Sequence, residues 1–158
     1  MPARLENGGA FHAIFLASPL PTFLTRARDR VIVEVNDAWV ALLGYSREEA
    51  VGRTTLELGL WTDEVQRTSI HEALRSNGRV SGVEMQMRMR GGRTCLVSID
   101  AGLELVQGEP FHWGFLRDIT AERQDLGAVI RYSRWVDRIS ATAIPAGLAA
   151  FALGWALP

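Results

Sequence analysis

Apolar residues repeat with two different periods along the chain, and the changes of period divide it into elements. Between Val83 and Met89, and again between Cys95 and Leu103, apolar and polar residues alternate, which is the pattern of a half-buried strand. Three other segments are rich in the β-branched and aromatic residues that strands favour. Five strands are therefore predicted, over residues 21–27, 31–35, 83–89, 95–103 and 109–117.

Helix start and stop signals fill the interval between the second and third strands. A short helix is predicted from Asn36, a good N-cap residue, to Gly44, a good C-terminal one. Ser46 and Glu49 fit a capping box. Thr62 is the predicted N-cap of a longer helix that closes at residues 77–78.

Turn residues join the strands, and helices are predicted at both ends of this array. Turns are expected between the strands at three pairs of residues: Asp29-Arg30, Gly91-Gly92 and Gln107-Gly108. A cap helix is predicted over residues 1–18 and a linker helix over residues 121–138. Strands gathered into one antiparallel sheet, with helices on one face, make an α+β domain.

Composition and charge exclude some functions. The chain has 158 residues and a net charge of -1, so electrostatics favour neither a nucleic acid nor an anionic membrane as a partner. Its one cysteine, Cys95, cannot form an internal disulfide and favours a reducing compartment. Neither a catalytic motif nor metal-ligand spacing is present, so we predict neither an enzyme nor a metal site.

Six short segments together carry a resemblance to a known family. They are SPLPTF (18–23), VIVEVNDAW (31–39), LLGYSREEAVGRT (42–54), LELGLW (56–61), the GGR hairpin (91–93) and FLRDITAER (115–123). As a set they resemble the PAS domain family of bacterial signalling proteins. The resemblance implies a five-stranded antiparallel sheet that cups a small cavity against short helices, followed by a signalling helix. The domain is then residues 19–120.

The resemblance also implies a sensory or regulatory function. Such a domain detects a small ligand or a partner and passes its state through the C-terminal helix to an output module. Histidine kinases of two-component systems, chemoreceptors and cyclic-dinucleotide enzymes are the output modules that the family implies. Two alternatives stay open: a ligand-free dimerisation or interaction module, and a gas or redox sensor that binds haem or a small molecule. A stand-alone enzyme is disfavoured.

Large and polarisable side chains are the candidates for lining the cavity, because thioethers and aromatic rings fit irregular shapes. The same residues would equally form an ordinary core. The candidates are Trp39, Leu42, Trp61, His71, Met85, Met87, Cys95, Val97 and Trp113.

The cofactor is unknown from the sequence, but two classes are disfavoured. A LOV-type flavin photosensor would carry its reactive cysteine in a motif such as GRNCRFLQ, and the corresponding stretch here is GRTTLELG (52–59). We therefore predict no covalent flavin, and we expect Cys95 to be a small buried hydrophobe. His71 is the one histidine suitably placed for haem, and haem is not expected from a lone histidine. His112 alternates with Phe111 and Trp113, so it should point away from one face of the sheet.

An output joint is predicted at Asp118, Ile119 and Thr120. The strand ends there, and Thr120 is expected to cap the helix that begins at Ala121. The heptad spacing of Ile119, Leu126, Val129, Val136 and Ala143 favours a parallel homodimer. The alternative is a single amphipathic helix packed on its own sheet.

An uncharged run of twenty residues, 139–158, follows the linker. About 20 apolar residues cross a bilayer, so the run is a candidate transmembrane helix. Arg131, Arg134 and Arg138 precede it and would hold the domain in the cytoplasm. The alternative is an apolar helix that packs on the domain or on a dimer seam.

Overall fold

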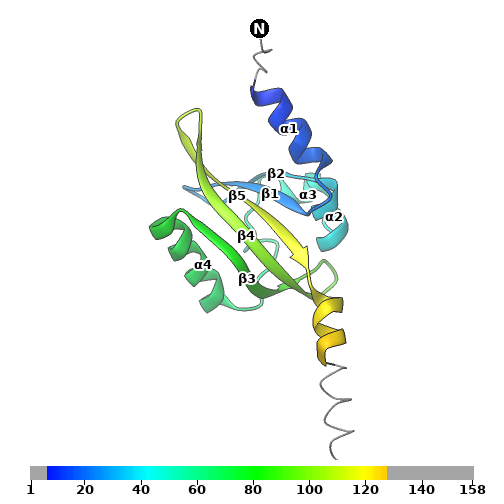
Figure 1. The fold of residues 1–158 in the computed structure, drawn as a ribbon. Coiled ribbons are helices and arrows are strands. Elements are labelled where there is room, and N and C mark those ends of the chain that lie inside the picture. The colour runs from blue at the N-terminus through cyan, green and yellow to red at the C-terminus, as the bar shows by residue number, and fades with distance from the viewer. Residues whose placement is uncertain (1–6, 128–158) are drawn as a thin grey trace, which may run out of the picture. The chain divides into compact units, whose positions relative to one another are not determined.

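The computed structural model describes residues 7–127, and its centre is a single five-stranded antiparallel sheet (Figure 1). The strand order is β2-β1-β5-β4-β3, so the first strand of the chain lies beside the last. The predicted α+β fold is confirmed, although β3 and β4 extend beyond the predicted limits. The strands are β1 (Thr22–Arg26), β2 (Ile32–Val35), β3 (Arg79–Arg88), β4 (Thr94–Val106) and β5 (Glu109–Asp118).

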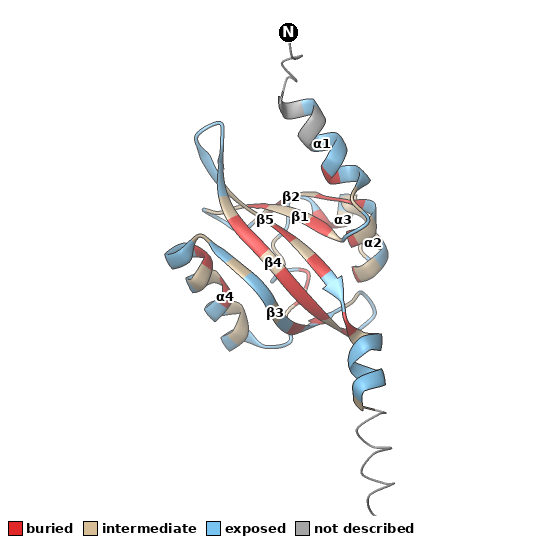
Figure 2. Ribbon diagram, viewed as in Figure 1, coloured by how far each residue is buried: buried red, intermediate tan, exposed pale blue. Residues whose placement is uncertain are grey.

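Short helices precede the sheet and connect its two halves. Helix α1 (Asn7–Ala17) precedes β1, and three helices connect β2 to β3: α2 (Asp37–Leu43), α3 (Arg47–Ala50) and α4 (Glu64–Asn77). Helix α4 packs against β3 and β4, α2 against β1, and α3 against β2. Figure 2 shows the buried positions running along the middle of β4 and β5, while the hairpin between these strands is exposed.

The predicted caps of the helices between β2 and β3 are confirmed, with one exception. Asn36 caps α2, whose C-cap Gly44 is left-handed, and Ser46 forms the expected capping box of α3. The N-cap of α4 is Asp63 instead of Thr62: its Oδ1 accepts hydrogen bonds from two backbone N–H groups of the first turn. The Thr62 hydroxyl is instead directed to β3, where it donates to the Gln86 carbonyl.

Asn36 ties the start of the chain to the sheet. Its side chain is fully buried and makes five hydrogen bonds. The Oδ1 atom accepts from the backbone N–H groups of Thr22 (2.9 Å) and Trp39 (3.0 Å). The Nδ2 atom donates to three carbonyls, those of Phe15, Ser18 and Leu20. One amide therefore fixes the end of α1, the start of β1 and the start of α2.

The chain falls into two compact units that meet at the Thr120–Ala121 bond. A helix begins at Thr120 and continues to residue 127, the end of the described range. The rest of the predicted linker helix, most of its heptad positions and the apolar segment 139–158 lie outside the described residues. Within residues 7–127, no helix combines the length and apolarity that a membrane crossing needs.

Candidate functional site

A cavity of about 50 Å³ lies within the apolar core, between the sheet and α4. This volume exceeds the roughly 10–15 Å³ that one water molecule needs and is far below the ~300–1,000 Å³ of pockets for drug-sized ligands. As it stands, the cavity has room for a small molecule. Its lining comprises Phe23, Thr25, Arg30, Ile32, Trp39, Thr55, Leu60, Trp61, Ile70, His71, Leu74, Met85, Met87, Ile99, Ala101, His112 and Leu116.

The strands present alternate residues to this cavity, as their period of two requires. On β4 these are Ile99 and Ala101, and on β5 they are His112 and Leu116. Gly114 lies between the last two, and a Cβ atom there would stand 2.5 Å from the ring of Phe23 on β1. Because Gly114 has no side chain, the Phe23 ring can occupy this position in the cavity wall.

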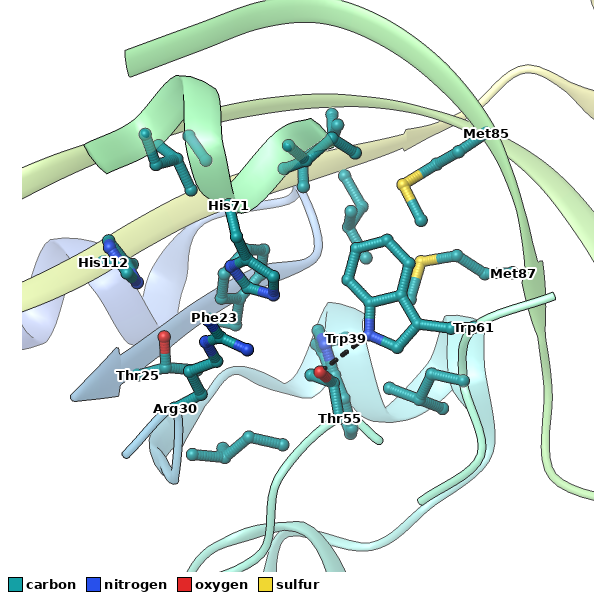
Figure 3. A pocket seen from close by; sticks show the side chains of 17 residues that line it. Phe23, Thr25, Arg30, Trp39, Thr55, Trp61, His71, Met85, Met87 and His112 are labelled. Atoms are coloured by element: carbon teal, nitrogen blue, oxygen red, sulfur yellow. Dashed lines mark hydrogen bonds between the residues drawn. The ribbon is translucent and has the colours of Figure 1, made fainter. Parts of the chain in front are cut away.

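Polar side chains gather on one side of the cavity, at Arg30, His71 and His112 (Figure 3). We call these three residues the mouth. Two solvent-open clefts, of about 280 and 340 Å³, share Arg30 and His71 with the cavity. The cavity thus has an apolar interior and a polar mouth beside solvent.

The two histidines of the mouth are held in their neutral form. Burial, followed by the charge of Arg30 and the proximity of His112 and Arg67, lowers the pKa of His71 to about 4. Burial and Arg30 also lower the pKa of His112 below its usual value. The two ring centroids are 6.3 Å apart. At neutral pH the fixed charge of the mouth is therefore that of Arg30.

The structure brings five of the nine candidate pocket residues together around the cavity: Trp39, Trp61, His71, Met85 and Met87. The Trp61 Nε1 atom donates to the Thr55 hydroxyl at 2.9 Å, which orients the indole ring. Leu42 packs against the core outside the cavity. Cys95 and Val97 are buried on β4 beyond the cavity lining, and burial raises the pKa of the Cys95 thiol.

Trp113 lies on the opposite face of β5, where it shares that face with Phe115. A Cβ atom on Gly102 would approach the Trp113 ring to 2.7 Å, so the ring covers that glycine. Sequence reasoning placed Trp113 with the cavity and left out Arg30, Thr25 and His112. The alternation on β5 was the available signal, because His112 shares its parity with the buried Leu116.

The predicted output joint is held by hydrogen bonds to β4, and one of its assigned roles is wrong. Asp118 caps the helix start, because its Oδ1 accepts from the Thr120 N–H at 2.9 Å. Thr120, the residue predicted as the cap, directs its hydroxyl to the backbone of Leu96: it accepts from the N–H at 2.9 Å and donates to the carbonyl at 3.4 Å. The N–H of the buried Ile119 also donates to the Leu96 carbonyl.

Comparison with known proteins agrees with this architecture. The sequence matches the family PAS, described as PAS fold, over residues 9–119. Similar solved structures include a PAS domain from a two-component sensor histidine kinase, with 20% identity and a TM-score of 0.61 over 71% of this chain and 96% of that one. A PAS domain from Colwellia psychrerythraea has 22% identity and a TM-score of 0.63, over 72% and 97% of the two chains.

A third similar structure is the PAS domain of an HTR-like protein from Haloarcula marismortui. It has 27% identity and a TM-score of 0.59, over 72% of this chain and 93% of that one. No curated protein matches the chain significantly.

Proposed function

This chain belongs to the PAS family, and we propose that it is a sensory domain that detects a small molecule in its cavity. In this proposal the ligand-bound and ligand-free states differ in the conformation of β4 and β5. Asp118, Ile119 and Thr120 transmit this conformational difference out of the domain. The helix that begins at Thr120 then passes it to an output module. Family membership and the presence of a small cavity with a polar mouth support this proposal.

One observation carries the proposed route: the same two strands line the cavity and hold the joint. On β4, Ile99 and Ala101 line the cavity, and Leu96 bonds to Thr120 and Ile119. On β5, His112 and Leu116 line the cavity, and the strand ends at the capping residue Asp118. A shift of either strand on ligand binding therefore acts directly on the hydrogen bonds that start the helix.

Filling the cavity by mutation tests the route without knowledge of the ligand. Ala101→Val adds two methyl groups to the cavity wall and keeps a residue type that strands favour. We expect amide hydrogen exchange at Leu96, Ile119 and Thr120 to change several-fold in the full chain. Thr94→Val, at an exposed position of the same strand, is the control and should leave these amides unchanged. Unaltered exchange at all three amides in Ala101→Val would exclude the route.

We further propose that the output module is a histidine kinase, a chemoreceptor or a cyclic-dinucleotide enzyme, and that the domain works in the cytoplasm. Joining the full chain to a histidine kinase core gives a direct readout. Thr120→Val should change the autophosphorylation rate of the fusion while the domain stays folded by circular dichroism. An unchanged rate would remove the joint from the signalling route.

A homodimerisation function is the second candidate, and the aromatic face of β5 favours it. Phe111, Trp113 and Phe115 share the face opposite the cavity, and none of them is fully buried. A second copy that packs on this face would cover the three rings, and burial of apolar surface drives such association. Sedimentation of the full chain tests this: Phe115→Ser should shift a dimer towards monomer. Equal sedimentation of the two proteins would exclude this face.

A further inference from the structure

The mouth of the cavity holds a positive charge that no described carboxylate neutralises. Arg30 lines the cavity and both adjoining clefts, and it forms no ion pair within residues 7–127. Its neighbours Arg26 and Arg28 each pair with Asp29. The turn therefore contains one carboxylate and three guanidinium groups, and the group left over is the one that faces the cavity.

The clefts beside the mouth share this excess of positive charge. Arg75 on α4 lines both of them, and Glu72 lines one. No ion pair joins Glu72 to Arg75 or to Arg30 in the described part of the chain. An anion that approaches the mouth therefore meets guanidinium groups on both sides of its entrance, and such a field raises its local concentration.

The backbone holds Arg30 in an uncommon conformation. Its φ angle is 62°, in the left-handed region that side chains other than Gly, Asn and Asp rarely adopt. The Arg30 N–H donates to the Arg26 carbonyl, and the Val31 N–H donates to the Asp29 carboxylate. These bonds fix the turn, and Figure 3 shows the Arg30 side chain extending toward His71. Strain of this kind is common where a side chain must be aimed at a ligand.

The chemistry of the mouth suits a singly charged anion. Arg30 supplies one charge and a planar set of donors, which matches a carboxylate in a bidentate pair. The neutral imidazoles of His71 and His112 each add one N–H donor. The His71 Nδ1 atom is buried and has no hydrogen-bond partner among the described residues. A ligand oxygen beside His71 would satisfy this atom.

The interior of the cavity limits the size and polarity of the part of the ligand that lies beyond its charged group. Trp39, Met85 and Met87 line it with aromatic and thioether groups, and its volume is about 50 Å³. On the premise of the proposed sensory function, we propose that the ligand is a short-chain carboxylic acid in its anionic form. Its carboxylate binds Arg30 between His71 and His112, and its hydrocarbon body packs against Met85 and Met87.

Methionine methyl groups report directly on this cavity, because the chain has four methionines and two of them line it. In full-length protein with ¹³C-labelled methionine methyls, butyrate, hexanoate and phenylacetate are titrated in turn. The corresponding amides are titrated as neutral matches. We expect saturable shifts of Met85 and Met87, and at least tenfold tighter binding of an acid than of its amide. We also expect the ring pKa of His71 to rise by about one unit on saturation, as a nearby anion requires.

Charge variants identify the anion site. Arg30→Gln should weaken binding of the acid at least tenfold and leave binding of the amide unchanged, whereas Arg30→Lys should retain part of the preference. Arg93→Gln, which removes the same charge from the hairpin at the other end of β4, should bind as the original protein does.

Three outcomes overturn the inference: amides that bind as tightly as acids, acid binding that is unchanged in Arg30→Gln, or no methyl shift with any acid. Tight binding of amides would remove the carboxylate and leave the sensory function standing. The sensory function itself fails only if Ala101→Val also leaves the amides of the joint unaltered.

Discussion

Two groups of interior polar side chains differ in how completely they are paired. Asn36 makes five hydrogen bonds, and Thr120 bonds to both backbone groups of Leu96. On α4, by contrast, Arg67 Nε and His71 Nδ1 are buried without a partner in the described residues. Because an unpaired buried polar group is costly, the first group fixes the fold, whereas the second has bonding capacity left for a partner outside the chain.

Among these polar side chains, the fully hydrogen-bonded Asn36 should give the largest loss of stability when it is replaced. Asn36→Ala removes all five side-chain hydrogen bonds and leaves buried N–H and C=O groups unsatisfied. We expect a loss of about 2–4 kcal/mol in the free energy of unfolding, measured by urea denaturation. Asn77→Ala, at the exposed last residue of α4, should cost no more than about 0.5 kcal/mol. Equal losses in both variants would contradict the role assigned to Asn36.

Thr120→Val gives the next largest effect. It keeps the shape of the side chain and removes both hydrogen bonds to Leu96. The expected loss is about 1–2 kcal/mol of unfolding free energy, because the Leu96 N–H loses its acceptor. Faster amide exchange at Leu96 should accompany it. Protection of Leu96 that matches the original protein would show that Thr120 is not its partner in solution.

The sequence predicted the helices well, and its two errors in capping have one cause. In each case a threonine stands next to or near an aspartate, Thr62 by Asp63 and Thr120 by Asp118, and both residue types make good caps. Each threonine hydroxyl instead bonds to a neighbouring strand, which leaves the aspartate to cap the helix. Local propensity cannot resolve this choice, because the strand partner is distant in the sequence.

The residues that line the cavity could be predicted from the sequence only in part. Residues chosen for size and polarisability, such as Met85 and Met87, do line it. Arg30 was not predictable as a lining residue, because its direction depends on a turn with positive φ. Trp113 was misplaced because an aromatic residue suits either face of a sheet, and only alternation relative to Leu116 reveals its face.

His71, whose Nδ1 atom has no hydrogen-bond partner among the described residues, predicts a pH dependence of stability. The pKa of His71 is about 4 in the folded chain, chiefly because of burial, and about 6.5 when unfolded. As the pH falls from 6.5 to 4, the unfolded chain takes up a proton that folded His71 refuses, so stability falls. The groups that influence or adjoin His71 are Arg30, Arg67, Glu72, Arg75 and His112.

His71→Leu isolates this contribution. The variant lacks the titrating ring, so over the same pH range it should lose less unfolding free energy than the original protein, by about 1 kcal/mol after allowance for solvent screening. Urea denaturation at several pH values measures the difference. Parallel pH profiles for the two proteins would show that His71 is not held neutral.

The smallest effect separates backbone strain from charge at the mouth. Arg30 and Gln107 are the two described residues other than glycine with positive φ, at 62° and 54°. Replacing either by glycine relieves the same strain, so each variant should gain about 0.5–1 kcal/mol of unfolding free energy, less the entropy that glycine adds to the unfolded chain.

Only Arg30→Gly also removes the charge that depresses the pKa values of His71 and His112. Ring titration by NMR should therefore show both pKa values rising in Arg30→Gly and neither moving in Gln107→Gly. If both variants left the two pKa values unchanged, the Arg30 guanidinium would lie too far from the histidines to share an anion with them.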